Sequence, residues 1–523
     1  MKKKLNWVVF RRRVFVILTL LIQIAFLVSL VTGAGIYFQY TNWILRILSI
    51  IVCVHVLNKH AKAAYKITWI FLNMLFPIFG GILYIFFNLQ SNPRKFRRLI
   101  KKSIQNSRDA FYLSGNHLPD LLNTYPEFGP QAHYLQDYAG FPVYTNTRSV
   151  YFDSGEAFFQ RVLKELEKAR KYIFLEFFIL REGVMLDPII SIMERKAREG
   201  LDVRIIYDDL GCFMSLPAHY RKTLREKGIK CFVFNPFKPI LSSLQNNRDH
   251  RKIIIIDGKT AFTGGLNLAD EYINAVDRFG RWKDAAIMLE GEGAWPFTLI
   301  FLQMWNLQPS TEGSPSAEGA PIAHDTYESL YPWKESPCEV KPDGYVQPYA
   351  DSPVDEENVG EHVYIQIINK AKKYVYINTP YLVIDDSLLS ALALAAKSGV
   401  DVRIITPHRW DKWIVAMTSR SYYRQLISAG IKVYEYTSGF NHGKTFVCDD
   451  AIATVGTTNL DFRSLYLHFE CGVVLYHSGA IQAIKDDFLR TIPVSHEVTL
   501  QECARNAFQR IFLDVLRIFA PLM

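Results

Sequence analysis

Apolar residues dominate the first hundred positions in three long runs, 14–38, 43–58 and 67–89. The first and third runs contain no charged residue, whereas the second is shorter and contains Arg46. About 20 apolar residues in a helix suffice to cross the hydrocarbon core of a bilayer. We therefore expect transmembrane helices over 14–38 and 43–58. The run 67–89 is either a third crossing or a re-entrant hairpin broken at Pro77.

The basic start of the chain also fits a cleavable signal peptide. Signal peptides, however, have a shorter apolar core of about 7–15 residues, and here further apolar runs follow. Basic clusters lie at 2–13, 59–66 and 94–102, and the loop 39–42 has none. Positively charged segments that flank membrane helices favour the cytoplasmic side. Two crossings followed by a re-entrant hairpin place all three clusters on that side. We expect a multi-pass cell-membrane protein with a membrane module at 1–102 and the rest of the chain on the cytoplasmic face.

Beyond residue 147, one pattern of helices and strands occurs twice. The segments 196–204 (KAREGLDVR) and 397–403 (KSGVDVR) precede strand-like runs in the two copies. Alternating helices and strands predict parallel strands joined by crossover helices. We expect two α/β/α domains related by a pseudo-twofold axis.

These two domains should span 148–307 and 346–523. Residues 103–147 are interpreted as an irregular connector from the membrane module. The segment 308–345 is rich in Ser, Pro, Gly and Glu, so we interpret it as an exposed linker.

Composition narrows the class of protein. Half of the residues are apolar (49%), which excludes a disordered chain. The net charge is +9, yet residues 1–102 hold sixteen Lys and Arg and no acid, so the rest is net negative. Nucleic-acid-binding proteins usually carry positive charge on the globular part, so this distribution favours a membrane surface over nucleic acid as partner. Seven cysteines without a CxxC pair predict reduced thiols and no zinc site.

A spaced motif, His-x-Lys-x4-Asp followed by Gly and Asn, occurs in both copies at a constant offset of 192 residues. Its members are His250, Lys252, Asp257, Gly264, Gly265 and Asn267 in the first copy and His442, Lys444, Asp449, Gly456 and Asn459 in the second. Residues i and i+2 of a strand point the same way, so each His projects with its Lys. Each Asp lies about 17 Å further along the strand, and we expect it to hold structure.

Two histidines, two lysines and two asparagines that converge across a twofold axis predict a phosphate site. Lysines neutralise the phosphate oxygens, one imidazole attacks phosphorus to form phosphohistidine, and the other exchanges protons with the alcohols. We expect the glycines to let the backbone approach the ligand and the asparagines to donate N–H groups to it. The cationic groups supply the charge stabilisation, so no metal or cofactor is expected.

Each catalytic imidazole needs an orienting partner on its other nitrogen. Asp284 and Glu470 are acids at the start of apolar strands, where an unpaired carboxylate would be costly, so we interpret them as these partners. Each could serve the histidine of its own copy or that of the other copy. Other polar residues are interpreted as solvated charges (Arg248 and Arg251) or as structural histidines without a repeat partner (His60, His219, His408 and His468).

The paired motif resembles the phospholipase D superfamily, and the order of parts resembles bacterial cardiolipin synthases. Three segments strengthen the resemblance, 69–87, 378–381 and 456–464. It implies that two phosphatidylglycerols of the bilayer are joined into cardiolipin with release of glycerol. It also implies a catalytic set of His250, Lys252, Asp257, His442, Lys444 and Asp449, with His250 as nucleophile and His442 as acid and base. A third apolar segment departs from the usual two, and nothing specifies an oligomeric state.

Other functions fit the same motif. A phospholipase D-type hydrolase or a phosphatidylserine-type synthase differs only in the acceptor, which product analysis would distinguish. A nuclease is disfavoured by the negative charge of the soluble part and would show salt-dependent DNA binding. A non-catalytic scaffold would be expected to have lost one motif, whereas both are intact.

Overall fold

A computed structural model describes eight stretches of the chain: 35–59, 61–76, 80–84, 92–236, 243–307, 325–355, 357–504 and 506–522. The chain divides into two compact units. The smaller comprises Met1–Lys95, Phe237–Asn247 and Asp514–Met523, and the larger comprises Phe96–Pro236 and Arg248–Leu513.

The smaller unit is built on α2 (Gly35–Leu57) and α3 (Ala63–Leu75), which pack against each other. Trp69 and Tyr84 lie in its core with ring centroids 5.3 Å apart. The expected helix 43–58 corresponds to α2, which begins earlier, at Gly35. Most of 14–38 lies outside the described residues, as does Pro77. Within the described stretches, no helix combines the length and hydropathy that a membrane crossing requires.

The larger unit contains two sheets with matching strand order. In the first, the order is β1 (Thr147–Phe152), β9 (Ala286–Gly291), β7 (Thr260–Gly264), β6 (Lys252–Ile256), β2 (Tyr172–Phe177), β3 (Asp202–Asp208) and β4 (Lys230–Phe234). In the second, the order is β10 (Tyr345–Asp351), β19 (His468–Tyr476), β17 (Ile452–Gly456), β16 (Thr445–Cys448), β11 (Tyr374–Asn378), β13 (Asp401–Pro407), β14 (Lys432–Tyr436) and β20 (Ser495–Glu497). The repeat predicted from the sequence is therefore present strand by strand.

The sheets are mixed, and the prediction of parallel strands holds for only part of each. Strands β2, β3 and β4 are parallel, as are β11, β13 and β14. The motif strands β6 and β16 instead run antiparallel to both neighbours. The reason is local: Asp257-Gly258 and Asp449-Asp450 have positive φ angles and form tight hairpin turns into the next strand.

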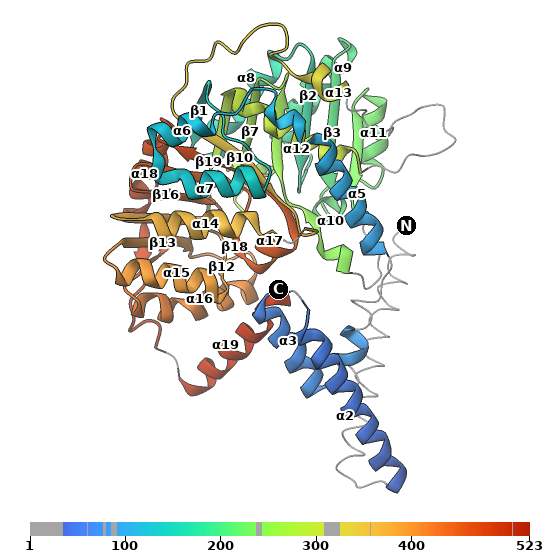
Figure 1. Cartoon of the computed structure of the whole chain (residues 1–523), viewed down its shortest axis with the longest axis vertical. Coiled ribbons are helices and arrows are strands. Elements are labelled where there is room, and N and C mark those ends of the chain that lie inside the picture. Colours follow the sequence, from blue (N-terminus) through green and yellow to red (C-terminus); the bar gives the residue numbers. More distant parts are fainter. Residues whose placement is uncertain are drawn as a thin grey trace. The chain divides into compact units, whose positions relative to one another are not determined.

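Helices cover both faces of the first sheet (Figure 1). Alternate residues of β2 point to opposite faces: Ile173 and Leu175 join the core with α8 (Gly155–Glu167) and α9 (Leu186–Arg198), whereas Phe174 stacks on Phe301. Phe301 belongs to α12 (Trp295–Trp305), which is buried along its whole length and also contacts β10 of the second half.

The second half carries the corresponding helices α14 (Val359–Lys370), α15 (Asp386–Lys397), α16 (Trp413–Ser428) and α18 (Ala480–Thr491). Helix α18 packs on its own sheet and also contacts β1 of the first half. Strands β7 and β9 contact β17, and β7 also contacts β19, so equivalent strands of the two halves meet at the centre of the unit. The ends of these strands lead to the histidine motifs.

The connecting segments are more ordered than expected. Residues 103–147 are not irregular but contain short helices, namely the end of α5 (Asn92–Ser107), α6 (Leu118–Thr124) and α7 (Gly129–His133). They are tied to α12, because Trp295 donates to Ala110 O at 2.8 Å. The expected exposed linker lies outside the described residues at 308–324. From α13 (Asp325–Leu330) onward it packs on the unit, with Tyr327 buried.

Candidate active site

Two short backbone ladders tie the halves together at the histidines. Strand β5 (Arg248–Asp249) pairs with the start of β19, and β15 (Gly439–Asn441) pairs with β8 (Arg281–Lys283). The next residue extends each ladder: His250 N donates to Phe469 O at 2.9 Å, and His442 N donates to Lys283 O at 2.7 Å. Each histidine is thereby placed beside the acid that follows in the other half.

The two imidazole–carboxylate pairs are crosswise. His250 Nδ1 lies 2.9 and 3.0 Å from the two carboxylate oxygens of Glu470, and His442 Nδ1 lies 2.7 Å from Asp284 Oδ2. All four side chains are buried. With Nδ1 engaged, Nε2 of each ring is the atom left for chemistry. Of the two arrangements that the sequence allows, the structure has the one in which each acid serves the other half.

The motif lysines lie against the same two residues. Lys252 Nζ donates to the carbonyl of His250, and Lys444 Nζ to that of His442, with His442 Nδ1 at 2.9 Å. Burial lowers the pKa of Lys252 to about 8 and that of Lys444 to about 7. A bound phosphodiester would favour their charged forms, so both suit an anionic substrate.

The surroundings of both histidines favour the neutral imidazole. Burial, and then the charge of Lys444, lower the pKa of His442 to about 4, although Asp284 opposes this shift. Burial, and then Lys252, hold the pKa of His250 well below its ordinary value. A neutral imidazole is the form that acts as nucleophile or base.

The two carboxylates differ in environment. Burial alone would raise the pKa of Asp284, but His442 and Lys444 outweigh it and leave this pKa below its ordinary value. Burial raises the pKa of Glu470 well above its ordinary value, although Lys252 and two hydroxyls oppose the shift. Those hydroxyls belong to Thr457, whose Oγ1 donates at 2.5 Å, and to Ser464.

The motif aspartates are engaged elsewhere. The carboxylate of Asp257 accepts the N–H groups of residues 170–172 at 2.7–2.8 Å. That of Asp449 accepts those of residues 372–374 at 2.6–2.9 Å. Each thus holds the start of a central strand to the hairpin after the motif strand. This geometry agrees with the structural role expected from their distance along the strand, and not with a place among the reacting groups.

The motif glycines accommodate neighbouring protein atoms where a ligand had been expected. A Cβ at Gly265 would lie 1.9 Å from Asp284 Oδ1, and one at Gly264 would lie 2.4 Å from Ala285 O. At Gly456 it would lie 2.6 Å from Cys471 O. The glycines therefore let the strands that carry the partner acids approach the motif.

The two asparagines are less equivalent than the motif suggests. Asn267 accepts from Ile179 N at 3.0 Å and donates to the hydroxyl of Tyr272 at 2.6 Å, so its amide is engaged within the chain. Asn459 is buried, and its Oδ1 has no hydrogen-bond partner among the described residues. Of these two motif asparagines, Asn459 is the one whose amide oxygen has no partner among the described residues.

Two arginines beside the motif were interpreted as solvated charges, and that interpretation is wrong. Arg248 and Arg251 are 1% and 3% exposed. Arg251 Nε donates to the carbonyl of Glu470 at 3.2 Å, so it helps to position this acid. The period of two along the strand could have indicated this, because it turns Arg251 away from the side shared by His250 and Lys252.

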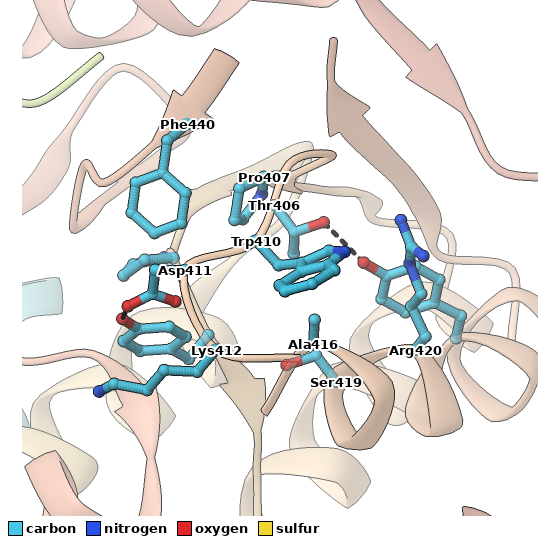
Figure 2. Close-up of a pocket in the computed structure, with 12 residues that line it drawn as sticks. Thr406, Pro407, Trp410, Asp411, Lys412, Ala416, Ser419, Arg420 and Phe440 are labelled. Carbon is cyan, nitrogen blue, oxygen red and sulfur yellow. Dashed lines mark hydrogen bonds between the residues drawn. The ribbon is translucent and has the colours of Figure 1, made fainter. Parts of the chain in front are cut away.

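A shallow hollow open to solvent lies near the second histidine. Figure 2 shows Trp410 and Phe440 facing it, with Lys412 at its edge. The ring of Phe440 also lies 5.8 Å from that of His442, which connects the hollow to the reacting centre. Its aromatic walls and cationic edge suit an amphipathic, anionic ligand.

Comparisons with known proteins agree with this geometry. The family model described as cardiolipin synthase, phospholipase D-like domain, matches residues 162–278 and 364–492, and a phospholipase D-nuclease N-terminal model matches 47–87. A cardiolipin synthase from Halalkalibacterium halodurans is 32% identical and covers 94% of this chain and 98% of its own. One from Alkalihalophilus pseudofirmus is 34% identical, covering 92% and 95%. An uncharacterized protein from Streptococcus mutans is 43% identical, covering 90% and 99%.

A solved structure supports the fold alone. The phosphatidylserine synthase of Haemophilus influenzae superposes with a TM-score of 0.54 at 15% identity. The match covers 74% of this chain and 96% of that one.

Proposed function

We propose the following reaction for this chain, which belongs to the cardiolipin synthase family of phospholipase D-like enzymes: two phosphatidylglycerols give cardiolipin and free glycerol. The observation that carries the proposal is the crosswise arrangement of His250–Glu470 and His442–Asp284. It supplies two neutral imidazoles with fixed Nδ1 atoms and two lysines in one buried site.

The first step forms a covalent intermediate. Nε2 of His250 attacks the phosphorus of one phosphatidylglycerol, and the bond to its terminal glycerol breaks. His442 gives a proton to the departing alkoxide. The phosphodiester charge and Asp284 together favour the imidazolium that this step needs. Lys252 and Lys444 balance the charge on the phosphate oxygens.

The second step reverses the proton transfers. A terminal hydroxyl of a second phosphatidylglycerol gives its proton to His442 and attacks phosphorus, and the bond to His250 breaks. Cardiolipin leaves and both histidines return to their starting states. Neither step calls for a metal or an organic cofactor.

The substrate places the enzyme at a membrane. We assign residues 1–102 as a multi-pass anchor in the cell membrane and the larger unit to the cytoplasmic face. The larger unit supports this with an exposed apolar surface made of Trp413, Ile414, Phe508, Ile511 and Phe512. The rings of Trp413 and Phe512 are 6.1 Å apart, and the spacing 508, 511, 512 is one face of a helix.

Exposed cations lie close in sequence to these apolar residues, namely Arg409, Lys412 and Arg510. Basic residues beside exposed aromatic and aliphatic side chains match the headgroup level of an anionic bilayer. We therefore assign a phospholipid bilayer as the occupant of the surface.

Photoreactive lipids test this assignment. In vesicles containing phosphatidylglycerol with a photoreactive acyl chain, we expect labelling of peptides that contain Trp413 and Phe512. The substitution Ile511→Asp should reduce that labelling severalfold, because a charge is costly at acyl-chain depth. Met214, which is 91% exposed outside this surface, provides the control and should stay unlabelled. Equal labelling at Met214 and Phe512 would contradict the assignment.

Product analysis tests the function. Purified protein in vesicles of labelled phosphatidylglycerol, with a chelator present, should release cardiolipin and glycerol in equal amounts. Phosphatidic acid as the main product would make the protein a hydrolase. Phosphatidylserine formed in the presence of serine, without cardiolipin, would make it a phosphatidylserine-type synthase.

A further inference from the structure

One largely buried side chain near the reacting centre has no role in the steps above. His468 is the first residue of β19, and its ring centroid lies 5.5 Å from that of His250. Its side chain is 11% exposed, and its Nδ1 lies 3.8 Å from Glu470 Oε1. Neither ring nitrogen makes a hydrogen bond with the described residues. A largely buried imidazole whose ring nitrogens make no hydrogen bond is costly, so this position indicates a partner from outside the chain.

The fold itself does not require a histidine here. The ladders place His468 beside Arg248 in one half and Trp282 beside Phe440 in the other. Trp282 packs on His442 at 5.3 Å, as His468 packs on His250. An aromatic pair thus borders one catalytic histidine, whereas an imidazole and a guanidinium border the other. Trp282 Nε1 donates to Asp284 Oδ2 at 3.4 Å, so the tryptophan offers one donor. The imidazole of His468 offers two ring nitrogens, one of which can accept a hydrogen bond.

The surroundings of His468 are cationic. After burial, the charges that lower its pKa come from Arg463, Lys252, Lys412 and Arg248. Arg463 is half-buried and forms no ion pair with a carboxylate of the described residues. Lys412 also lines the hollow in Figure 2, so positive charge continues from this hollow toward His468.

A metal ion is the competing occupant, because nitrogen and oxygen atoms of His250, His468 and Glu470 lie within 4.8 Å of one another. The carboxylate of Glu470 already accepts hydrogen bonds from His250, Thr457 and Ser464. Bringing a divalent cation among four positive side chains would be unfavourable. Charge therefore favours an anion.

We propose that His468 and Arg463 form a second phosphate subsite, which holds the phosphodiester of the acceptor phosphatidylglycerol while its hydroxyl attacks. This inference rests on the proposed function. The acceptor carries its own phosphate three carbons from the attacking oxygen, and both phosphates remain in cardiolipin on one glycerol bridge. A cationic subsite beside the phosphate on His250 would position the acceptor and select an acceptor that carries a phosphate.

The test compares two acceptors for one donor. Labelled phosphatidylglycerol transfers its phosphatidyl group either to a second phosphatidylglycerol or to ethanol, which has no phosphate. We expect His468→Trp, which installs the residue of the equivalent position, and Arg463→Gln to lower the ratio of cardiolipin to phosphatidylethanol about tenfold. The apparent KM for phosphatidylglycerol as acceptor should rise with it. His219→Gln, at an exposed histidine elsewhere, should leave the ratio unchanged.

Several results would overturn the subsite. Equal loss with both acceptors would mean that His468 acts on the attacked phosphate or on structure. An unchanged ratio in both variants would remove the subsite. Zinc inhibition that needs His468, with an unchanged ratio, would make it a metal site. Failure of the wild-type protein to transfer to either acceptor would instead refute the proposed function.

Discussion

Replacing either His250 or His442 by alanine is expected to lower cardiolipin formation at least ~10³-fold. Loss of His250 removes the nucleophile, and loss of His442 removes the proton donor and acceptor. The measurement is product formation in phosphatidylglycerol vesicles, with a thermal melt to show that the variants fold. His219→Ala, at an exposed histidine away from the site, is the matched control and should keep wild-type activity.

An activated donor separates the two roles. Phosphatidyl-p-nitrophenol releases an anion that needs no proton, so His442→Ala should still give one rapid equivalent of p-nitrophenol. His250→Ala should give none, because no bond to phosphorus forms. Bursts in both variants, or in His250→Ala alone, would contradict the assignment of His250 as nucleophile.

The substitutions Asp284→Asn and Glu470→Gln are expected to lower the rate about 10²-fold each. Both keep the size of the side chain but remove the negative charge that supports an imidazolium in the other half. Because Asp284 raises the pKa of His442, its loss should shift the limb of the pH–rate profile set by His442 to lower pH. Asp284 also raises the pKa of Lys444, so the limb set by Lys444 should move to lower pH as well.

An exposed carboxylate serves as the matched control. Glu335→Gln removes one negative charge away from the site and should change neither the rate nor the profile. If Asp284→Asn lowered the rate without moving the profile, its role would be in folding and not in supporting the charge on His442.

Much of this site could be predicted from the sequence, because the repeat is long and its spacing is constant. The offset between His250 and His442 identified two equivalent halves, and the period of two along a strand placed Lys252 and Lys444 with them. The same argument separated Asp257 and Asp449 from the histidines. The free-energy cost of burying an unpaired carboxylate identified Asp284 and Glu470 as partners of the histidines.

The crosswise pairing could not be predicted, because it depends on ladders between residues some 160–220 positions apart, such as Arg248 with His468. The antiparallel direction of β6 and β16 was also not predicted, because it follows from the hairpin turn after each of these strands. The contact between the Asp284 carboxylate and Gly265 could not be predicted either. The same holds for the burial of Arg251, because both depend on how the two halves pack against each other. The sequence did not single out His468, because the equivalent residue of the first half is Trp282. Two different residue types do not reveal that their positions are equivalent.

The configuration at phosphorus tests the central claim, transfer through a covalent histidine intermediate, most directly. A phosphatidylglycerol made chiral at phosphorus by sulfur and oxygen isotopes would be converted by the purified protein to a single transfer product. Two successive in-line displacements, on His250 and then on the acceptor hydroxyl, predict net retention of configuration. Net inversion would mean that the acceptor attacks the lipid directly, and it would contradict the account.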